Sequence, residues 1–190
     1  MPVATPPFKL ACIGTHGVGK TTLCYGVAAR LKARDVQVEV VHEIARRCPL
    51  PINLETSVAS ESWILHTQVA EEILAAARYP VVLCDRSVLD NYVYLLLAAG
   101  PQREIEGFME PWMRTYDLLV HVPIVDQPSP DGIRALDPAF QRAVDQRLES
   151  ELEARHLPAL RLRPEDRDRW VDQVLDTVVE SIRPAQLELL

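Results

Sequence analysis

One short segment of the chain combines glycine, lysine and threonine in a pattern that binds phosphate. Residues 14–22 read Gly-Thr-His-Gly-Val-Gly-Lys-Thr-Thr, which fits the phosphate-binding loop G-x-x-x-x-G-K-[ST]. The glycines admit left-handed backbone angles and let main-chain N–H groups approach a phosphate closely. The residues expected to contact a bound nucleotide are those of this loop: Gly14, His16, Gly17, Val18, Gly19, Lys20, Thr21 and Thr22. Among them, His16 fills a variable position of the motif.

The last residues of this loop have side chains suited to a nucleoside triphosphate. In such loops the lysine, here Lys20, reaches the β- and γ-phosphates, and the following hydroxyl, here Thr21, ligates Mg²⁺. The apolar segment 8–13 precedes the loop, and a segment with helical spacing of apolar residues, 22–31, follows it. A helix that begins here adds the partial positive charge of its N-terminus. The sequence therefore predicts a site for a nucleoside triphosphate and Mg²⁺.

Two carboxylates directly follow apolar, strand-like segments. Asp85 is placed as a Walker B acid, which binds Mg²⁺ directly or through water. Its alternative is an ordinary aspartate in a turn at the end of a strand. Glu43 could take a proton from an attacking hydroxyl or hold the second substrate. Its alternative is a surface ion pair with Arg46 or Arg47, and for both acids we expect the functional role.

Several longer polar side chains are further candidates. Arg86 directly follows Asp85 and could contact a phosphate or the acceptor. Gln68 lies within a predicted helix, where its amide could read a base or ribose edge or could be an ordinary helix residue. An arginine that closes over a transferring phosphoryl group lowers the barrier. Arg134 is the candidate for that role; Arg142 and Arg147 follow it on a predicted helix, where a solvated face is the alternative.

The elements that must position these residues alternate between strand and helix along the chain. The expected strands are residues 8–13, 36–42, 80–85, 117–122 and 157–162, and the expected helices are 22–31, 57–78, 90–99, 103–115, 139–154 and 165–182. Such alternation is typical of the α/β class with a parallel sheet. Ligands on these sheets bind beyond the C-terminal ends of the strands. We therefore expect a three-layer α/β/α fold with a five-stranded parallel sheet and the candidate acids at one edge.

Residues 1–190 are expected to form one domain, since no internal repeat or second domain is visible. Residues 123–138 form a proline-rich, polar segment that is long for a connection. Long loops in compact domains are often lids. The sequence therefore predicts a lid region at about residues 123–147, which would close over the bound phosphates.

Composition restricts the class of protein further. Of the 190 residues, 48% are hydrophobic and 25% are charged, and the net charge is −7. This balance disfavours a protein that binds nucleic acid or a membrane surface nonspecifically. No apolar run approaches the length of a membrane span, and no secretory signal precedes the first strand. The four cysteines are widely spaced, which favours reduced thiols and a cytoplasmic location.

Taken together, these positions resemble the P-loop nucleoside and nucleotide kinases. The deoxynucleoside kinases combine the phosphate loop with a glutamate at the end of the second strand and an acidic-Arg-Ser triplet at the end of the third. Glu43 and the triplet of Asp85, Arg86 and Ser87 stand at these places. The resemblance implies that Glu43 is the base for a nucleoside hydroxyl, that Arg86 holds this base and that Gln68 reads the nucleobase. It also implies ATP as the phosphate donor.

Two short segments are similar to a neighbouring family. Residues 43–46, Glu-Ile-Ala-Arg, and 131–134, Asp-Gly-Ile-Arg, look closer to the ATPase-like family that contains the nicotinamide riboside kinase domain. Thymidylate kinases are also similar at the strand ends. The chain departs from many of these kinases in three ways: Ile44 replaces a proline, Asp85 replaces a glutamate, and the lid lacks a dense arginine cluster. These departures leave the acceptor open.

Three functions remain as alternatives. The first is an ATP-dependent kinase that phosphorylates a hydroxyl or a phosphate of a nucleoside- or nucleotide-like small molecule. The second is a kinase for a polynucleotide 5′-hydroxyl, which the acidic charge disfavours. The third is a nucleotide-dependent switch or ATPase that binds a protein partner. A GTPase is disfavoured because D-x-x-G and N-K-x-D motifs are missing, and a hexameric AAA+ machine because 190 residues leave no room for the usual helical lid domain. The oligomeric state stays open, with a homodimer as one expectation.

Overall fold

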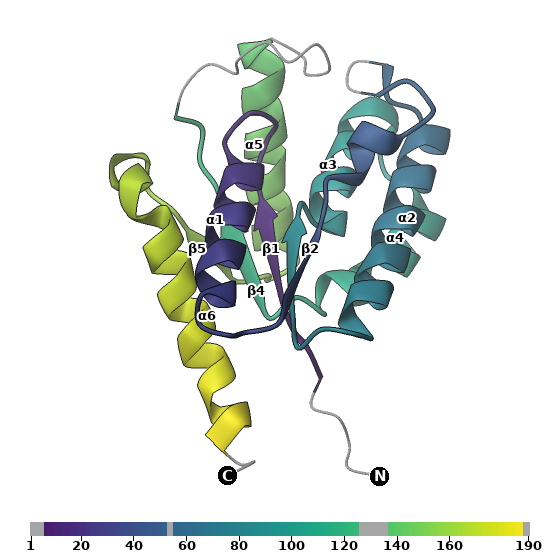
Figure 1. Cartoon of the computed structure of the whole chain (residues 1–190). Helices are drawn as coiled ribbons and strands as arrows, with labels where there is room; N and C mark the ends of the chain where they lie inside the picture. The colour runs from purple at the N-terminus through teal and green to yellow at the C-terminus, as the bar shows by residue number, and fades with distance from the viewer. Residues whose placement is uncertain (1–5, 53–54, 126–136, 188–190) are drawn as a thin grey trace.

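The structure, a computed structural model, describes residues 6–52, 55–125 and 137–187 (Figure 1). Its centre is a five-stranded parallel sheet with the order β2-β3-β1-β4-β5. The strands are β1 (Phe8–Ile13), β2 (Val38–Val41), β3 (Val81–Asp85), β4 (Leu118–His121) and β5 (Ala159–Arg161). Cys12 of β1 lies opposite Asp85 of β3. The end of β3 therefore lies beside the segment that leaves β1.

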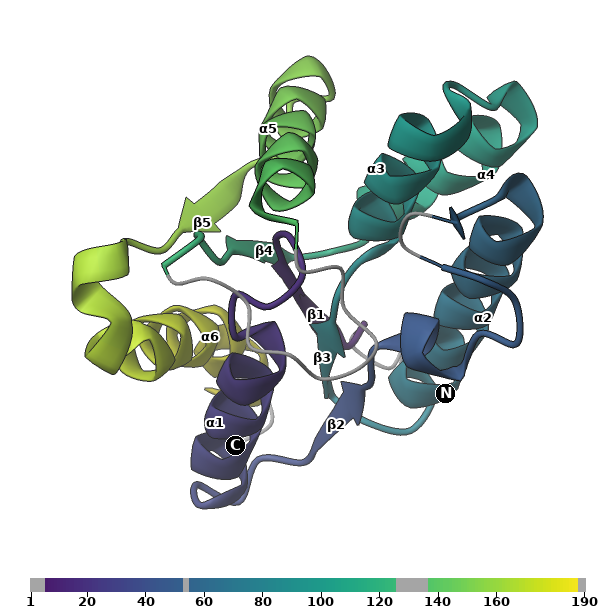
Figure 2. The ribbon, with the colours of Figure 1, turned by 90° about the horizontal axis from the view of Figure 1, so that it is seen from above.

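Helices cover both faces of this sheet (Figures 1 and 2). They are α1 (Lys20–Lys32), α2 (Val58–Ala76), α3 (Val88–Ala99), α4 (Arg103–Met113), α5 (Pro138–Ala154) and α6 (Trp170–Leu187), with short 3-10 helices η1 (Ile44–Arg47) and η3 (Pro164–Arg169). Helices α1 and α6 pack on one face, and α2, α3, α4 and α5 pack on the other. The predicted three-layer α/β/α fold is thereby confirmed.

Alternation along β1 explains why the sheet has two apolar faces. Leu10 and Cys12 are buried in the core formed with α1 and α6, whereas Ala11 and Ile13 are buried in the core formed with α2, α3, α4 and α5. A parallel sheet covered by helices on both sides needs such continuously apolar strands. All four residues have no exposed surface. The central strand therefore fixes where the loop after Ile13 begins.

Two serines define where the helices beside the site begin. The Ser57 side chain accepts a hydrogen bond from the Ser60 N–H, and the Ser60 side chain accepts one from the Ser57 N–H. Ser87 and Asp90 form the same reciprocal arrangement at the start of α3. These capping boxes satisfy N–H groups that a helix N-terminus leaves without partners. Ser57 is thus the N-cap of α2.

The expected elements are present, with differences at their ends. The strand expected at 36–42 is shorter, and the helix expected at 165–182 begins only at Trp170, because residues 164–169 form η3. Residues 126–136, which include most of the expected lid loop, lie outside the described residues. The end of the lid region that is described is the first part of α5. Within the described chain, none of the helices is both long and apolar enough to cross a membrane.

Candidate functional site

The loop between β1 and α1 has the backbone shape that its glycines predict. Gly14, Gly17 and Gly19 have φ angles of 139°, 78° and 97°. A Cβ atom on Gly14 would lie 2.6 Å from the carbonyl oxygen of Val122, so Gly14 also permits close contact with the end of β4. The Gly14 N–H donates to Asp90 Oδ1 at 2.9 Å. The loop is therefore fixed to β4 on one side and to α3 on the other.

Lys20 is buried at the base of this loop, with 5% of its surface exposed. Its ammonium donates to the carbonyl oxygens of Gly14 at 2.7 Å and Thr15 at 2.5 Å. Burial of the ammonium, together with the nearby positive charge of Arg86, lowers the pKa of Lys20 to about 8. A phosphate beside this ammonium would favour its charged form.

The hydroxyl and the carboxylate predicted to hold Mg²⁺ lie next to each other. Thr21 Oγ1 donates to Asp85 Oδ2 at 2.6 Å, and Asp85 is 3% exposed. Mg²⁺ prefers such oxygen ligands and is usually bound by one or two carboxylates together with phosphate oxygens and waters. The parts of the chain that the structure describes contain no cluster of three or more His, Cys, Asp or Glu side chains that would form an all-protein metal cage. Thr21 and Asp85 therefore fit Mg²⁺ that is bound together with a nucleotide.

Glu43 follows β2 and lies between two arginines. Arg86 Nε donates to Glu43 Oε1 and Arg46 Nε donates to Glu43 Oε2, each at 2.7 Å. Burial alone would raise the pKa of Glu43, but the charges of Arg86 and Lys20 and the two arginine hydrogen bonds outweigh it and lower this pKa to about 2. The ion pair that the sequence offered as the alternative for Glu43, with Arg46, is present. The pair with Arg86, whose side chain is 7% exposed, is the more deeply buried of the two.

These groups line one cavity at the C-terminal ends of the strands. Its walls are formed by residues of the loop, of the start of α1 and of the ends of β2 and β3: Gly17, Gly19, Lys20, Thr21, Thr22, Glu43, Asp85 and Arg86, with Arg167 added from η3. We call this the phosphate cavity. A lysine, a hydrogen-bonded hydroxyl and carboxylate, and an arginine-bound carboxylate thus face the same space.

A comparison with known protein families shows which family the chain belongs to. Residues 9–169 match the model of a family described as AAA domain. The chain belongs to this family of P-loop NTPases. A match of this length places the phosphate loop, Asp85 and most of the remaining fold within an AAA domain that binds a nucleotide. The expectation that the chain is not a hexameric AAA+ machine remains a prediction, since the match concerns the domain and not its assembly.

The AAA domain of this chain also resembles a solved kinase structure. Deoxyadenosine kinase from M. mycoides with bound dATP superimposes with a TM-score of 0.62, over 90% of this chain and 98% of the kinase. The sequence identity is 13%, so this likeness establishes the shared fold. No similar sequence was found among curated proteins.

Some predicted site residues of the AAA domain lie outside the phosphate cavity. The His16 side chain is buried, with its Nδ1 3.1 Å from the Tyr94 hydroxyl and its ring stacked on Phe140, and the Val18 side chain packs in the core with α1 and α6. The main chain of both residues still belongs to the loop. The His16 carbonyl accepts a hydrogen bond from Gln141 Nε2 at 2.9 Å, which attaches the start of α5 to the loop.

The three arginines predicted as candidates for the lid differ in where they lie. Arg134 lies outside the described residues, so its role stays a prediction. Arg142 is exposed on α5. Arg147 pairs with Glu151 at 2.9 Å, one helical turn further along. At least one of the three therefore lies on a solvated helix face, as the sequence allowed.

Gln68 lies behind Arg86 and does not line the phosphate cavity. Its Nε2 donates to Glu72 Oε1 at 2.8 Å and to the main-chain carbonyl of Arg86 at 3.3 Å. Arg86 has a φ angle of 96°, which is rare for a residue with a side chain. The Arg86 N–H donates to the carbonyl of Cys12 at 3.2 Å. Both peptide groups beside this strained residue are thus held by hydrogen bonds.

The Glu72 carboxylate is the centre of a buried polar network. Besides the Gln68 amide, it accepts hydrogen bonds from Lys9 Nζ at 2.9 Å, Trp112 Nε1 at 2.8 Å and the Tyr116 hydroxyl at 2.7 Å. Glu72 is 1% exposed. A buried carboxylate with this many donors is compensated for its loss of hydration. The network therefore anchors α2 to β1, α4 and the turn that follows β3.

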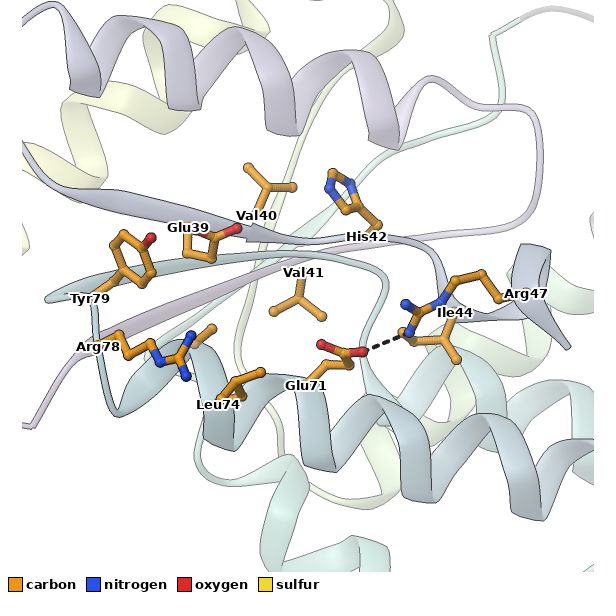
Figure 3. Close-up of a pocket in the computed structure, with 11 residues that line it drawn as sticks. Glu39, Val40, Val41, His42, Ile44, Arg47, Glu71, Leu74, Arg78 and Tyr79 are labelled. Carbon is orange, nitrogen blue, oxygen red and sulfur yellow. Dashed lines mark hydrogen bonds and ion pairs between the residues drawn. The ribbon is translucent and has the colours of Figure 1, made fainter.

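A separate hollow lies between β2 and α2 (Figure 3). Val41 and Leu74 contribute apolar surface, and Arg47 donates to Glu71 at 2.8 Å at the right-hand side in this view. None of the phosphate-loop residues lines it. It is therefore not part of the candidate site.

Several residues that shape the site are not predicted by the sequence. The sequence pattern predicts Arg167 within a helix and indicates no role for Asp90. The sequence Ser87-x-x-Asp90 fits a capping box, and this signal could have indicated Asp90. Glu61 and Asn91 line a second cavity beside Arg86. They are separated by 30 positions, and no local spacing links them.

Proposed function

We propose that this chain is an ATP-dependent kinase that transfers the γ-phosphate to a hydroxyl of a nucleoside-like small molecule. The observation that carries the proposal is the buried Glu43–Arg86 pair, 2.7 Å apart, in the wall of the cavity that also contains Lys20, Thr21 and Asp85. A nucleotide switch needs the last three residues. It has no evident need for a carboxylate fixed opposite them.

The phosphate loop would bind the phosphate donor. Main-chain N–H groups and the Lys20 ammonium would bind the β- and γ-phosphates, which lets the lysine leave the carbonyls of Gly14 and Thr15. Thr21 and Asp85 would hold Mg²⁺, which when bound neutralises charge that develops on the phosphate oxygens. ATP is favoured over GTP by the resemblance alone.

Glu43 would bind the hydroxyl of the acceptor. With a pKa of about 2, this carboxylate is ionised at neutral pH and can accept a hydrogen bond from the acceptor hydroxyl. A carboxylate has about four lone-pair sites, so the hydrogen bonds from Arg86 and Arg46 leave sites for a hydroxyl. Phosphoryl transfer depends mainly on positioning and electrostatics. Glu43 would therefore orient the hydroxyl first and take its proton as the new O–P bond forms.

The remaining parts of the proposal rest on the sequence. Arg134 would close over the transferring phosphate and stabilise its charge in the transition state. The net charge of −7 disfavours a polynucleotide acceptor. Cys12, Cys24, Cys48 and Cys84 are free thiols, which supports a cytoplasmic enzyme.

The test is a transfer assay with γ-labelled ATP and Mg²⁺. The acceptors are nucleosides, nucleoside monophosphates and 5′-hydroxyl oligonucleotides, each with wild-type protein and Glu43→Gln. Label on a nucleoside that depends on Glu43 supports the proposal. Label only in free phosphate, at the same rate in both proteins, would replace it with the nucleotide-dependent switch.

A further inference from the structure

His121, the last residue of β4, lies between two carboxylates of α5. Its Nε2 is 3.0 Å from Asp145 Oδ1, and its Nδ1 is 2.9 Å from Glu149 Oε1. The His121 side chain is 8% exposed, so the ring is largely shielded from water. We call these three side chains the histidine clamp. The clamp joins the sheet to the helix that follows the predicted lid loop.

The geometry of the histidine clamp fits a protonated ring. An ionised carboxylate only accepts hydrogen bonds, and a neutral imidazole donates from one nitrogen only. With a neutral ring, one of the two carboxylates would face a nitrogen lone pair with no hydrogen between them. An imidazolium donates from both nitrogens and satisfies both contacts. The contacts of His121 therefore fit its charged form.

The charged groups around this ring come from α5 and β5. Arg161 of β5 donates to Glu149 Oε2 at 2.7 Å, and Glu153, one helical turn beyond Glu149, acts on Arg161 through its charge. On β1 the residue beside His121 is Ile13, which is apolar. Arginine stays charged at any pH that the protein tolerates. The proton on His121 therefore decides how many hydrogen bonds the clamp makes.

Helix α5 connects the histidine clamp to the phosphate loop. Gln141, Asp145 and Glu149 are spaced by four residues, so they lie on one face of this helix. Gln141 is 2% exposed, and its Nε2 donates to the main-chain carbonyl of His16 at 2.9 Å. The Phe140 ring stacks on the His16 ring. The face of α5 that binds the clamp histidine thus also holds the loop.

Strand β4 holds the same loop from its other side. His121 lies beside Ile13, the last residue before the loop, and the Val122 N–H donates to the Ile13 carbonyl at 2.9 Å. Gly14 packs directly against the Val122 carbonyl. The histidine clamp therefore joins β4 and α5, the two elements that hold the loop at Gly14 and at His16.

We propose that His121 is a positioning residue for the phosphate loop and that its charge makes nucleotide binding depend on pH. While the ring is an imidazolium, two charge-assisted hydrogen bonds hold α5 against β4, and Gln141 holds the loop. When pH rises and the ring loses its proton, one contact becomes repulsive and α5 loosens. Nucleotide binding then weakens as pH rises. A kinase and a nucleotide switch would both have this property, so it goes beyond the proposed transfer reaction.

The first experiment measures the affinity for a non-hydrolysable ATP analogue with Mg²⁺ between about pH 6 and 9. In Asp145→Asn the new amide donates to a neutral ring or accepts from a charged one, so its affinity should not follow the ring proton. Wild-type affinity, divided by that of Asp145→Asn at the same pH, should fall by about tenfold over this range, as expected when one charged hydrogen bond is lost. Ionisation of Lys20 and of the analogue is common to both proteins and cancels.

Glu153→Gln is the matched control for this comparison. It removes one negative charge from the same helix, outside the contacts of the ring, and its affinity should follow that of wild type at each pH. Nitrogen NMR of the histidine rings measures the proton directly, and His121→Gln assigns the signal. Both ring nitrogens of His121 should be protonated at about pH 6. A neutral ring at that pH would overturn the inference.

A further variant separates positioning of the loop from stabilisation of the fold. Gln141→Leu keeps the histidine clamp and removes the hydrogen bond from α5 to the loop. Its thermal midpoint should keep the pH dependence of wild type, whereas its nucleotide affinity should lose it. A clamp that only stabilises the fold would change the midpoint with pH and leave the affinity of the folded protein unchanged.

The outcomes separate this inference from the kinase proposal. Parallel affinity curves for wild type and Asp145→Asn, or an unchanged pH dependence of affinity in Gln141→Leu, would overturn the positioning role of His121. The expected pH dependence without phosphate transfer to any acceptor supports the clamp and contradicts the kinase. Failure of the folded wild-type protein to bind the analogue at any pH would overturn both.

Discussion

Gln68 donates a hydrogen bond from its side-chain amide to the main-chain carbonyl of Arg86, at 3.3 Å. Arg86 has a φ angle of 96° and directs its guanidinium to Glu43. A residue with a side chain persists in this conformation only when its surroundings hold it there. Gln68, fixed in turn by Glu72, is one of the groups that do so. The side chain expected to read a base thus supports the turn that carries the arginine.

The first prediction separates these two roles of Gln68. Gln68→Met keeps the length of the side chain and removes its hydrogen bonds. If Gln68 positions Arg86, kcat should fall by about tenfold for every acceptor, as expected when one supporting hydrogen bond is lost. The ratio of kcat/KM between acceptors should stay constant. A change in this ratio, with kcat preserved, would instead assign Gln68 to base recognition.

The second prediction concerns Lys20. Lys20→Met should abolish turnover and weaken nucleotide binding, because no other lysine lines the described phosphate cavity. The folded state should tolerate the change, since burial already disfavours the charged ammonium and lowers its pKa to about 8. Nucleotide titration and a thermal melt measure the two effects separately. Full turnover by a folded Lys20→Met protein would contradict the assignment of the phosphate loop.

The third prediction concerns Glu43. Glu43→Gln should reduce transfer by about 10²- to 10⁴-fold, the usual contribution of a general base. It should also destabilise the protein, because the Arg86 charge loses its partner. The loss should stay below the roughly 3–5 kcal/mol of a fully buried pair, since the Glu43 side chain is 12% exposed. The double variant Glu43→Gln/Arg86→Gln removes both charges and should regain much of that stability without regaining transfer. Recovery of transfer in the double variant would show that Glu43 acts only through folding.

The fourth prediction follows from the raised pKa of Glu61, which burial moves from 4.5 to about 8 against the opposing charge of Arg86. Between these values the folded state keeps a proton that the unfolded state has released. The unfolded state therefore binds fewer protons, and the free energy of unfolding falls as pH rises from about 4.5 to 8.

Glu61→Gln removes the ionisable group and should lack this component of the fall. Urea unfolding of both proteins at several pH values between 5 and 8 measures the difference in slope. The other acids and bases are common to both proteins and cancel in the comparison. Parallel curves would show that the Glu61 carboxyl ionises freely in the folded state.

The residues that the sequence predicted best are those whose positions depend on local chain geometry. Lys20 and Thr21 follow from one continuous motif, and Asp85 follows from its place at the end of an apolar strand. In a parallel sheet the strand ends meet at one edge, so the contact between Thr21 and Asp85 could be anticipated from these two facts.

The residues that the sequence did not predict depend on packing between distant elements. Glu61 and Asn91 line one cavity because α2 and α3 lie side by side, and their burial becomes visible only in the folded chain. The hydrogen bond of Gln68 depends on the positive φ angle of Arg86. A sequence signals a positive φ angle mainly through glycine, so an arginine with this angle could not be predicted. The sequence predicts Arg167 within the last helix because the helical pattern of the following residues continues back over it. In the structure Arg167 lies in the 3-10 helix η3 instead.

The strand order has a consequence for how such a protein can change over evolutionary time. The phosphate loop leaves the central strand β1, whereas Glu43 follows the edge strand β2, which pairs with β3 alone. Most residues that line the second cavity, beside Arg86, come from this flank: from η1, the following segment and α2. If the chain is the kinase proposed above, substitutions or insertions there can create a preference for a new acceptor while the phosphate loop stays intact. The same catalytic apparatus could therefore be inherited unchanged by enzymes with different substrates.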